Sequence, residues 1–139
     1  MPRITHVNGR YVPHREAAVH VEDRGHQFAD AVYEVLPVVG GRLCHLEQHL
    51  DRLERSLGAL AIAWPVSRRV LSQILIRVAR LNRVVDGLVY VQISRGVAPR
   101  NHYFPADTQP GLVVSAWPHK GPSAEQVKKG VAVATRPDQ

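Results

Sequence analysis

The sequence has 139 residues, and its 45% hydrophobic composition is enough for the core of one globular domain, with or without a piece of a second. No apolar run has the length of a signal peptide or a membrane span, so we expect a cytoplasmic protein without a membrane partner. The net charge of +6 comes mainly from scattered arginines, so small anionic ligands are at least as good an interpretation as nucleic acid. The single cysteine, Cys44, excludes an internal disulfide and a multi-cysteine zinc site, and no metal site is expected.

The first part of the chain is predicted to form short antiparallel strands. The Asn8-Gly9 pair lies between two β-prone runs in residues 4–12, and such a pair is the strongest local signal for a tight hairpin. Residues 16–21 are expected to form another extended piece before residues 22–25 turn the chain.

Residues 31–39 are predicted to form a strand that is followed by a Gly-Gly turn and a second hairpin at residues 42–43. Pro37 cannot donate to a ladder, so it belongs at an edge or a bulge. Side chains alternate along a strand, and the more uniformly apolar set is Val32, Leu36 and Val38. This set is assigned to the core, which leaves Tyr33 on the opposite, open face of the sheet.

Two amphipathic helices are predicted next, and both are expected to cover one face of the sheet. Pro65 separates them, and Ser67 is a plausible cap for the second. Their apolar stripes are Leu46, Leu50, Leu53, Leu57 and Leu60 in the first helix, and Val70, Leu71, Ile74, Leu75, Val78 and Leu81 in the second.

Residues 88–93 are predicted to form a strand with Tyr90 and Gln92 on the open face. Two tyrosines, Tyr33 and Tyr90, would then line the same face, where their hydroxyl groups can meet a ligand. For any single tyrosine, packing with the hydroxyl at the surface is the more frequent arrangement.

The loop at residues 94–105 carries two side chains that can bind an anion. Pro99 fixes its own backbone and restricts the residue before it, so Arg100 is presented from a preordered chain. The arginine fork matches a carboxylate, and His102 adds a third donor. The loop is therefore predicted to trap a small carboxylic acid, and the alternative is an ordinary solvated loop.

A boundary is predicted after the strand at residues 111–116. We expect a small N-terminal domain at residues 1–117, an interdomain linker at 118–122, and the truncated start of a larger C-terminal domain at 123–139. A lone strand is predicted at residues 130–135.

Five blocks of sequence, in order, resemble the D-amino-acid aminotransferase branch of class IV, fold type IV, pyridoxal-phosphate enzymes. The resemblance spans almost the whole chain and implies the small α/β (α+β) domain of a homodimer, with an antiparallel-rich sheet under two helices. The blocks are Glu22-Asp23-Arg24-Gly25, residues 28–35, Gly41-Arg42-Leu43, His49-Leu50-Asp51-Arg52-Leu53 and residues 95–102.

The resemblance also implies roles for five residues. Arg52 would bind the phosphate of pyridoxal 5'-phosphate, and Tyr33 and Tyr90 would line the substrate site. Arg100 and His102 would trap the substrate carboxylate in the active site of the partner subunit. The implied reaction exchanges an amino group between a D-amino acid and a 2-oxo acid.

The chain departs from the family pattern at its end, because the Schiff-base lysine of the family would follow beyond Gln139. No catalytic residue is therefore assigned, and residues 1–139 are expected to be inactive alone. Two alternatives remain: a non-catalytic domain that dimerises or binds anions, and another class IV enzyme, namely a branched-chain aminotransferase or an aminodeoxychorismate lyase. Nucleic-acid binding is placed lowest.

Overall fold

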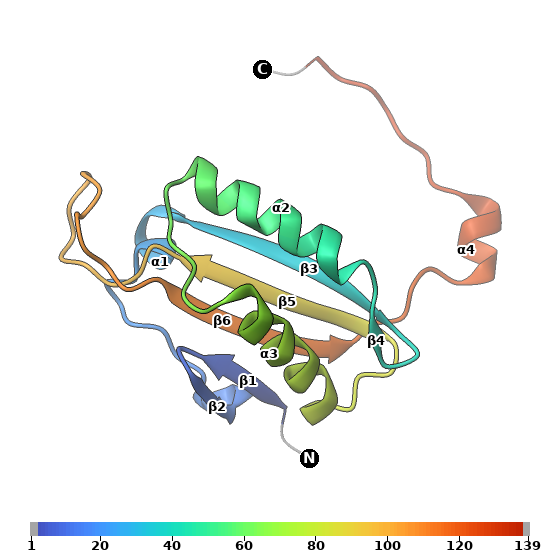
Figure 1. Ribbon diagram of the computed structural model, residues 1–139. Helices are drawn as coiled ribbons and strands as arrows, with labels where there is room; N and C mark the ends of the chain where they lie inside the picture. Colours follow the sequence, from blue (N-terminus) through green and yellow to red (C-terminus); the bar gives the residue numbers. More distant parts are fainter. Residues whose placement is uncertain (1–2, 138–139) are drawn as a thin grey trace.

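The computed structural model describes residues 3–137 and contains one six-stranded antiparallel sheet, with strand order β2-β1-β6-β5-β3-β4 (Figure 1). The strands are β1 (Ile4–Val7), β2 (Arg10–Pro13), β3 (Ala31–Val39), β4 (Arg42–Leu43), β5 (Gly87–Ser94) and β6 (Gly111–Pro118). The helices are α1 (Arg24–Phe28), α2 (Leu46–Ala59), α3 (Arg68–Leu81) and α4 (Ala124–Lys129), with a 3-10 turn, η1, at His14–Glu16.

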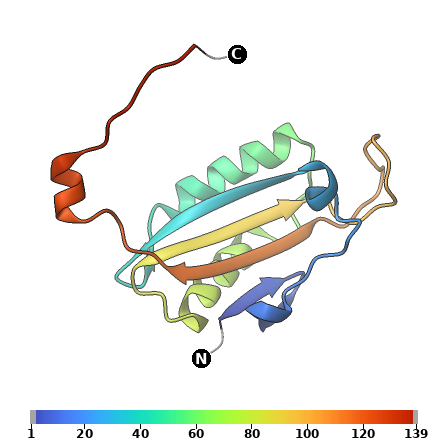
Figure 2. The same cartoon turned by 180° about the vertical axis from the view of Figure 1, so that it is seen from behind.

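The sheet has one covered and one open face. Helices α2 and α3 lie on the same face, whereas the view from behind shows the central strands β3, β5 and β6 without a helix over them (Figure 2). The segment with α4 runs away from the sheet (Figure 1). The predicted architecture, an antiparallel sheet with two helices on one face, is confirmed.

Both predicted hairpins are present. Asn8 and Gly9 have φ angles of 46° and 85°, which is the pair of positive values that a tight type I′ connection between β1 and β2 requires. The second hairpin joins β3 to β4, which pairs only with Val38 and Val39 at the end of β3. Pro37 thus lies just outside the β4 ladder, in agreement with its predicted position at an edge.

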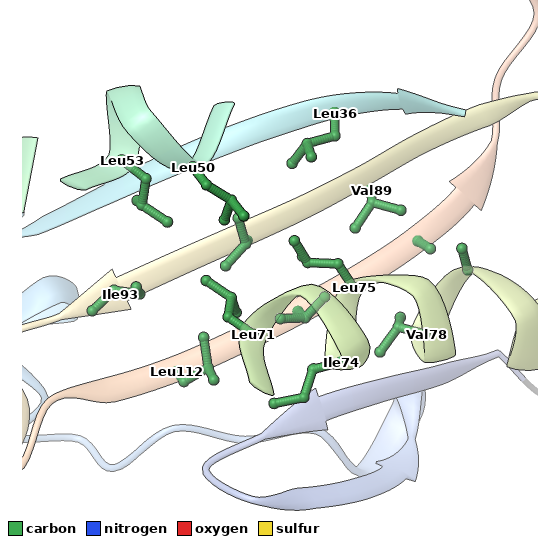
Figure 3. Close-up of a cluster of buried hydrophobic side chains, with 14 of the residues drawn as sticks. Leu36, Leu50, Leu53, Leu71, Ile74, Leu75, Val78, Val89, Ile93 and Leu112 are labelled. Carbon is green, nitrogen blue, oxygen red and sulfur yellow. The ribbon is translucent and has the colours of Figure 1, made fainter. Parts of the chain in front are cut away.

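The core lies between the two helices and the covered face of the sheet, and Figure 3 shows how its side chains interdigitate. Its most deeply buried members include Leu36, Leu50, Leu53, Leu71, Leu75, Val78, Val89 and Ile93. Three predicted stripe residues are instead exposed: Leu60 follows the last residue of α2, and Val70 and Leu81 flank the buried stripe of α3.

Two predicted strands are absent from the described chain, and one predicted turn is only partly right. Residues 16–21 form no strand, because η1 ends at Glu16 and an irregular segment follows. The predicted turn at residues 22–25 is present in part, since a turn at residues 21–22 leads into helix α1, whose first backbone N–H groups are capped by the Asp23 carboxylate. Residues 130–135 also lack a strand in the described chain, since an apolar β-prone segment needs a neighbouring strand to pair with.

Within residues 3–137, no helix is both long enough and apolar enough to span a bilayer. The same residues hold no group of three or more histidine, cysteine, aspartate or glutamate side chains arranged to bind a metal ion.

Candidate functional site

The open face of the sheet presents an aromatic pair. Tyr33 on β3 lies opposite Gln92 on β5, and Val35 lies opposite Tyr90, so the two tyrosines are diagonal neighbours. Their rings stack with centroids 5.7 Å apart, and 64% of Tyr33 is exposed. The prediction that both tyrosines lie on the open face is therefore confirmed.

The Tyr90 hydroxyl donates a hydrogen bond to Oε1 of Gln92. Burial raises the pKa of Tyr90, and the neighbouring Tyr33 raises it further. The phenol therefore remains protonated at neutral pH and presents a neutral hydrogen-bonding group beside Tyr33. Such a group orients a polar ligand without adding charge.

A cavity of about 260 Å³ with a mixed polar and apolar lining lies on the open face beside Gln92. Its lining includes Gln92, Ser94, Asp23 and His26. The Ser94 hydroxyl donates to the Asp23 carboxylate at 2.7 Å, so the far wall of the cavity is held by a hydrogen bond between β5 and the cap of α1. Gln92 joins the two features, because it lines the cavity and accepts the hydrogen bond from Tyr90.

A carboxylate on the other face of β3 holds Arg52. Glu34 is buried, with 4% of its side chain exposed, and it accepts two hydrogen bonds from Nε and Nη2 of Arg52, each at 2.6 Å. His49 Nδ1 lies 2.7 Å from the same carboxylate. Burial alone would raise the pKa of Glu34, but hydrogen bonds and charge from Arg52 and His49 outweigh it and lower the pKa.

Arg52 keeps hydrogen-bonding capacity for a ligand. Its Nε and Nη2 atoms face Glu34, whereas Nη1 has no hydrogen bond among the described residues, and 60% of the side chain is exposed. A guanidinium has five N–H donors, so a phosphate can bind the outer edge while the inner edge stays fixed. The donor set fits the phosphate of pyridoxal 5'-phosphate.

Sequence reasoning missed Glu34, although a signal was present. It alternates with Val32 and Leu36 on the face assigned to the core, and a carboxylate there requires a cationic partner. His49 and Arg52, three residues apart on α2, are those partners.

The loop after β5 brings Arg100 and His102 together at one aromatic ring. The Arg100 guanidinium carbon is 5.1 Å from the centre of the Phe28 ring, and the His102 ring centre is 5.5 Å from it. Both side chains are exposed, and the loop projects beyond the end of the sheet near α1 (Figure 1). The structure thus places both predicted anion-binding groups on one accessible tip, with Phe28 as a support that the sequence did not reveal.

A buried ionic cluster lies under this loop. Asp30 accepts two hydrogen bonds from Arg95, at 2.7 and 3.0 Å, and one from Arg24 at 2.8 Å. Burial would raise the pKa of Asp30, but the two arginines outweigh it through hydrogen bonds and charge, and the pKa is lowered. The cluster was not predicted, although all three residues belong to the sequence blocks quoted above.

The structure does not bring all five predicted site residues into contact. Tyr33 and Tyr90 touch each other, and Arg100 and His102 share Phe28. Among the described residues, no hydrogen bond, ion pair or ring contact joins the tyrosines to the loop or to Arg52. The five predicted site residues therefore fall into three separate groups: the two tyrosines, the pair on the loop, and Arg52.

Residues 31–139 match the family model for amino-transferase class IV. The chain belongs to this family. It is 37% identical over 131 residues to the D-alanine aminotransferase of Bacillus licheniformis, covering 94% of this chain and 46% of that protein. It is 31% identical to the D-alanine aminotransferase of Staphylococcus epidermidis over 95% of this chain and 47% of the relative. The chain thus spans about half the length of these class IV relatives.

Solved structures show the same fold. The 4-amino-4-deoxychorismate lyase of Pseudomonas aeruginosa is 32% identical, with a TM-score of 0.75 over 91% of this chain and 44% of that chain. The branched-chain amino acid aminotransferase of Escherichia coli is 20% identical, with a TM-score of 0.78 over 86% of this chain and 42% of that chain. The class IV assignment from the sequence is therefore confirmed.

Proposed function

We propose that these residues form the N-terminal part of a pyridoxal-phosphate-dependent aminotransferase that moves an amino group between a D-amino acid and a 2-oxo acid. The D-alanine aminotransferase relatives support this assignment. The proposal includes a cytoplasmic homodimer, in which the partner subunit receives the loop that carries Arg100 and His102. Residues 123–139 are proposed to begin the larger second domain.

The observation that carries the proposal is the pairing of Arg100 with His102 at Phe28. An arginine and a histidine on one exposed tip offer several donors in a fixed arrangement to a carboxylate. Every amino acid and 2-oxo acid that takes part in amino transfer carries this carboxylate next to the reacting carbon. The tip therefore suits recognition of the feature that both substrates share.

Arg52 is proposed to hold the cofactor phosphate, with Glu34 fixing its guanidinium plane. When bound, pyridoxal 5'-phosphate supplies the electron sink that amino transfer requires. Tyr33 and Tyr90 would line the substrate side of the site, with the neutral Tyr90 phenol as a hydrogen-bonding group.

The lysine that would bind the cofactor aldehyde is not assigned within this chain. Its three lysines are Lys120, Lys128 and Lys129, and all are exposed, in the predicted linker or in α4. A catalytic lysine is normally desolvated or placed beside another charge, which tunes its pKa. We therefore propose that none of the three serves this role.

A second candidate is a class IV lyase. The observation that favours it is the 32% identity to the 4-amino-4-deoxychorismate lyase, over 91% of this chain. The third candidate function is that of a non-catalytic domain that binds anions or dimerises. Turnover of D-amino acids separates the first candidate from both others, because neither a lyase nor a binding domain consumes them.

The proposal is tested by replacing Arg100 in the full-length protein. Arg100→Ala is expected to raise the KM for D-amino acids by about 10- to 100-fold, the range expected for a lost charge-assisted hydrogen bond. Arg100→Lys should fall between Arg100→Ala and wild type, because lysine keeps the charge and loses the fork. Steady-state kinetics that are unchanged in Arg100→Ala would contradict the assignment of the carboxylate trap.

A further inference from the structure

We propose that Arg24 is a positioning residue for the substrate carboxylate and acts through the backbone of Asn101. The inference rests on the proposed function, since it concerns how Arg100 and His102 are held. Arg24 lies in α1, far before Arg100 in the sequence, and among the described residues its side chain donates hydrogen bonds only to Asp30 and Asn101.

The contacts of Arg24 connect the buried cluster to the tip of the loop. Only 3% of its side chain is exposed. Nε donates to Oδ2 of Asp30 at 2.8 Å, and Nη1 donates to the carbonyl oxygen of Asn101 at 2.8 Å. Asn101 stands between Arg100 and His102, so this hydrogen bond fixes the backbone at the residue that separates the two side chains.

Arg24 also supports the ring that the two side chains share. Its guanidinium carbon lies 4.7 Å from the centre of the Phe28 ring, and the same ring contacts Arg100 and His102. A guanidinium over an aromatic ring is attracted by the electrons of its face. Arg24 therefore supports Arg100 and His102 through two contacts, one with the Asn101 backbone and one with the Phe28 ring.

The base of the loop is held independently of the Arg24 side chain. Arg95 forms two hydrogen bonds with Asp30 and donates to the carbonyl oxygens of Leu60 and Ala61, at 2.7 and 3.0 Å. The Arg95 backbone N–H donates to the Asp30 carbonyl at 3.0 Å. Removing the Arg24 side chain leaves Asp30 paired with Arg95 and the loop base attached. We therefore expect only the positions of residues 100–102 to be disturbed.

The test compares wild-type full-length protein with Arg24→Met and Arg24→Lys. In Arg24→Met, the side chain keeps a similar length and apolar character but donates no hydrogen bond. In Arg24→Lys, the ammonium group keeps the charge but lacks the planar fork that reaches Asp30 and Asn101 together. Arg24→Met is expected to raise the KM for D-alanine and for 2-oxoglutarate by about tenfold, with kcat changed by less than about threefold. Arg24→Lys should restore part of the loss.

Two readouts separate positioning from general destabilisation. Amide hydrogen exchange should become faster in residues 97–105 of Arg24→Met and stay unchanged in α2 and α3. In an Arg100→Met/His102→Asn background, Arg24→Met should change the KM by less than about twofold, because both groups that Arg24 positions are already absent. Arg68→Met, which removes a surface arginine paired with Glu47 and Asp51, is the matched control and should leave the kinetics unchanged.

The inference is overturned if wild-type protein is active while Arg24→Met keeps its KM and its exchange pattern. It is also overturned if Arg24→Met raises the KM as much in the Arg100→Met/His102→Asn background as in wild type. A wild-type protein without transaminase activity would overturn both the proposed function and this inference. The two failures are therefore distinguished by wild-type turnover.

Discussion

Glu34 binds Arg52 through both carboxylate oxygens, at 2.6 Å each, and thereby ties strand β3 to helix α2. The pair fixes the plane of an arginine whose outer edge remains exposed. Under the proposed phosphate role of Arg52, the exposed edge of the guanidinium is already oriented, and less side-chain entropy is lost when the phosphate binds.

Replacement of Arg52 should weaken cofactor retention and leave substrate preference nearly unchanged. Arg52→Ala removes the fork, and Arg52→Lys keeps the charge without the fork, so the affinity for pyridoxal 5'-phosphate should fall in the order wild type, Lys, Ala. The ratio of activity between different D-amino acids should stay the same, since a phosphate anchor is remote from the reacting carbon. Absorbance titration of the cofactor-free, full-length protein measures the affinity.

Arg55→Ala is the matched control for this experiment, because Arg55 is another exposed arginine on the same helix. Equal cofactor affinity in wild type and Arg52→Ala would contradict the phosphate assignment. A loss of affinity in Arg55→Ala as large as in Arg52→Ala would indicate a nonspecific charge effect.

Asp30→Asn should destabilise the fold strongly. The carboxylate neutralises two buried arginines, and its removal leaves the charges of Arg24 and Arg95 without a counter-ion. Breaking a buried pair in this way costs about 3–5 kcal/mol of the free energy of unfolding. Urea unfolding followed by circular dichroism measures the loss, and Asp51→Asn, at an exposed ion pair with Arg68, is the control. Equal midpoints for the two variants would contradict this account of Asp30.

The alternation of apolar residues predicted the sheet, its two faces and the place of Tyr33 and Tyr90. The Asp30 cluster could not be predicted in the same way, because Arg95 is 65 residues away and reaches Asp30 only through the pairing of β3 with β5. Residues 130–135 show the opposite case. Their local β propensity predicted a strand, but the backbone there is irregular because no neighbouring strand pairs with it.

The partial prediction of the helix stripes has a similar cause. Helical spacing identified Leu50, Leu53 and Leu57 correctly, but it does not show where a helix ends or how wide the buried stripe is. Leu60 therefore fell outside α2. The proposed positioning role of Arg24 was harder still to predict from the sequence. It depends on a hydrogen bond to the backbone carbonyl of Asn101, and sequence patterns do not report such contacts.

Stability should fall in two stages on acidification. Burial lowers the pKa of His6, so the unfolded chain binds a proton that the folded protein resists, and stability begins to fall below the ordinary histidine pKa of about 6.5. The pKa values of Asp30 and Glu34 are also lowered. Their contribution is present above the ordinary carboxyl pKa of about 4 and is lost as the pH falls through the lower folded values.

Urea unfolding of the protein between pH 3 and pH 7 checks this prediction. The first stage should be flattened in His6→Gln, which cannot take up the proton, whereas the second stage should remain. A free energy of unfolding that stays constant or rises from pH 7 to pH 3 would contradict the directions given for all three groups.

Residues 1–139 alone should not catalyse amino transfer. Within residues 3–137, no side-chain hydrogen bond or ion pair holds the exposed Lys120, Lys128 or Lys129, so the gain from proximity to a substrate carbon is not expected. Pyridoxal 5'-phosphate added to this chain should give no single, stoichiometric adduct after borohydride reduction and dialysis. A trapped adduct at one lysine together with turnover would show that a lysine of this segment is catalytic.

The most direct measurement of the central claim is the stereochemistry of amino transfer by the full-length protein. Purified protein supplied with pyridoxal 5'-phosphate and 2-oxoglutarate is offered D-alanine, L-alanine or L-leucine, and in a separate reaction 4-amino-4-deoxychorismate. The account predicts that D-alanine is consumed with formation of glutamate, and that the other three compounds are not. Turnover of L-leucine, or cleavage of 4-amino-4-deoxychorismate, without turnover of D-alanine would contradict it.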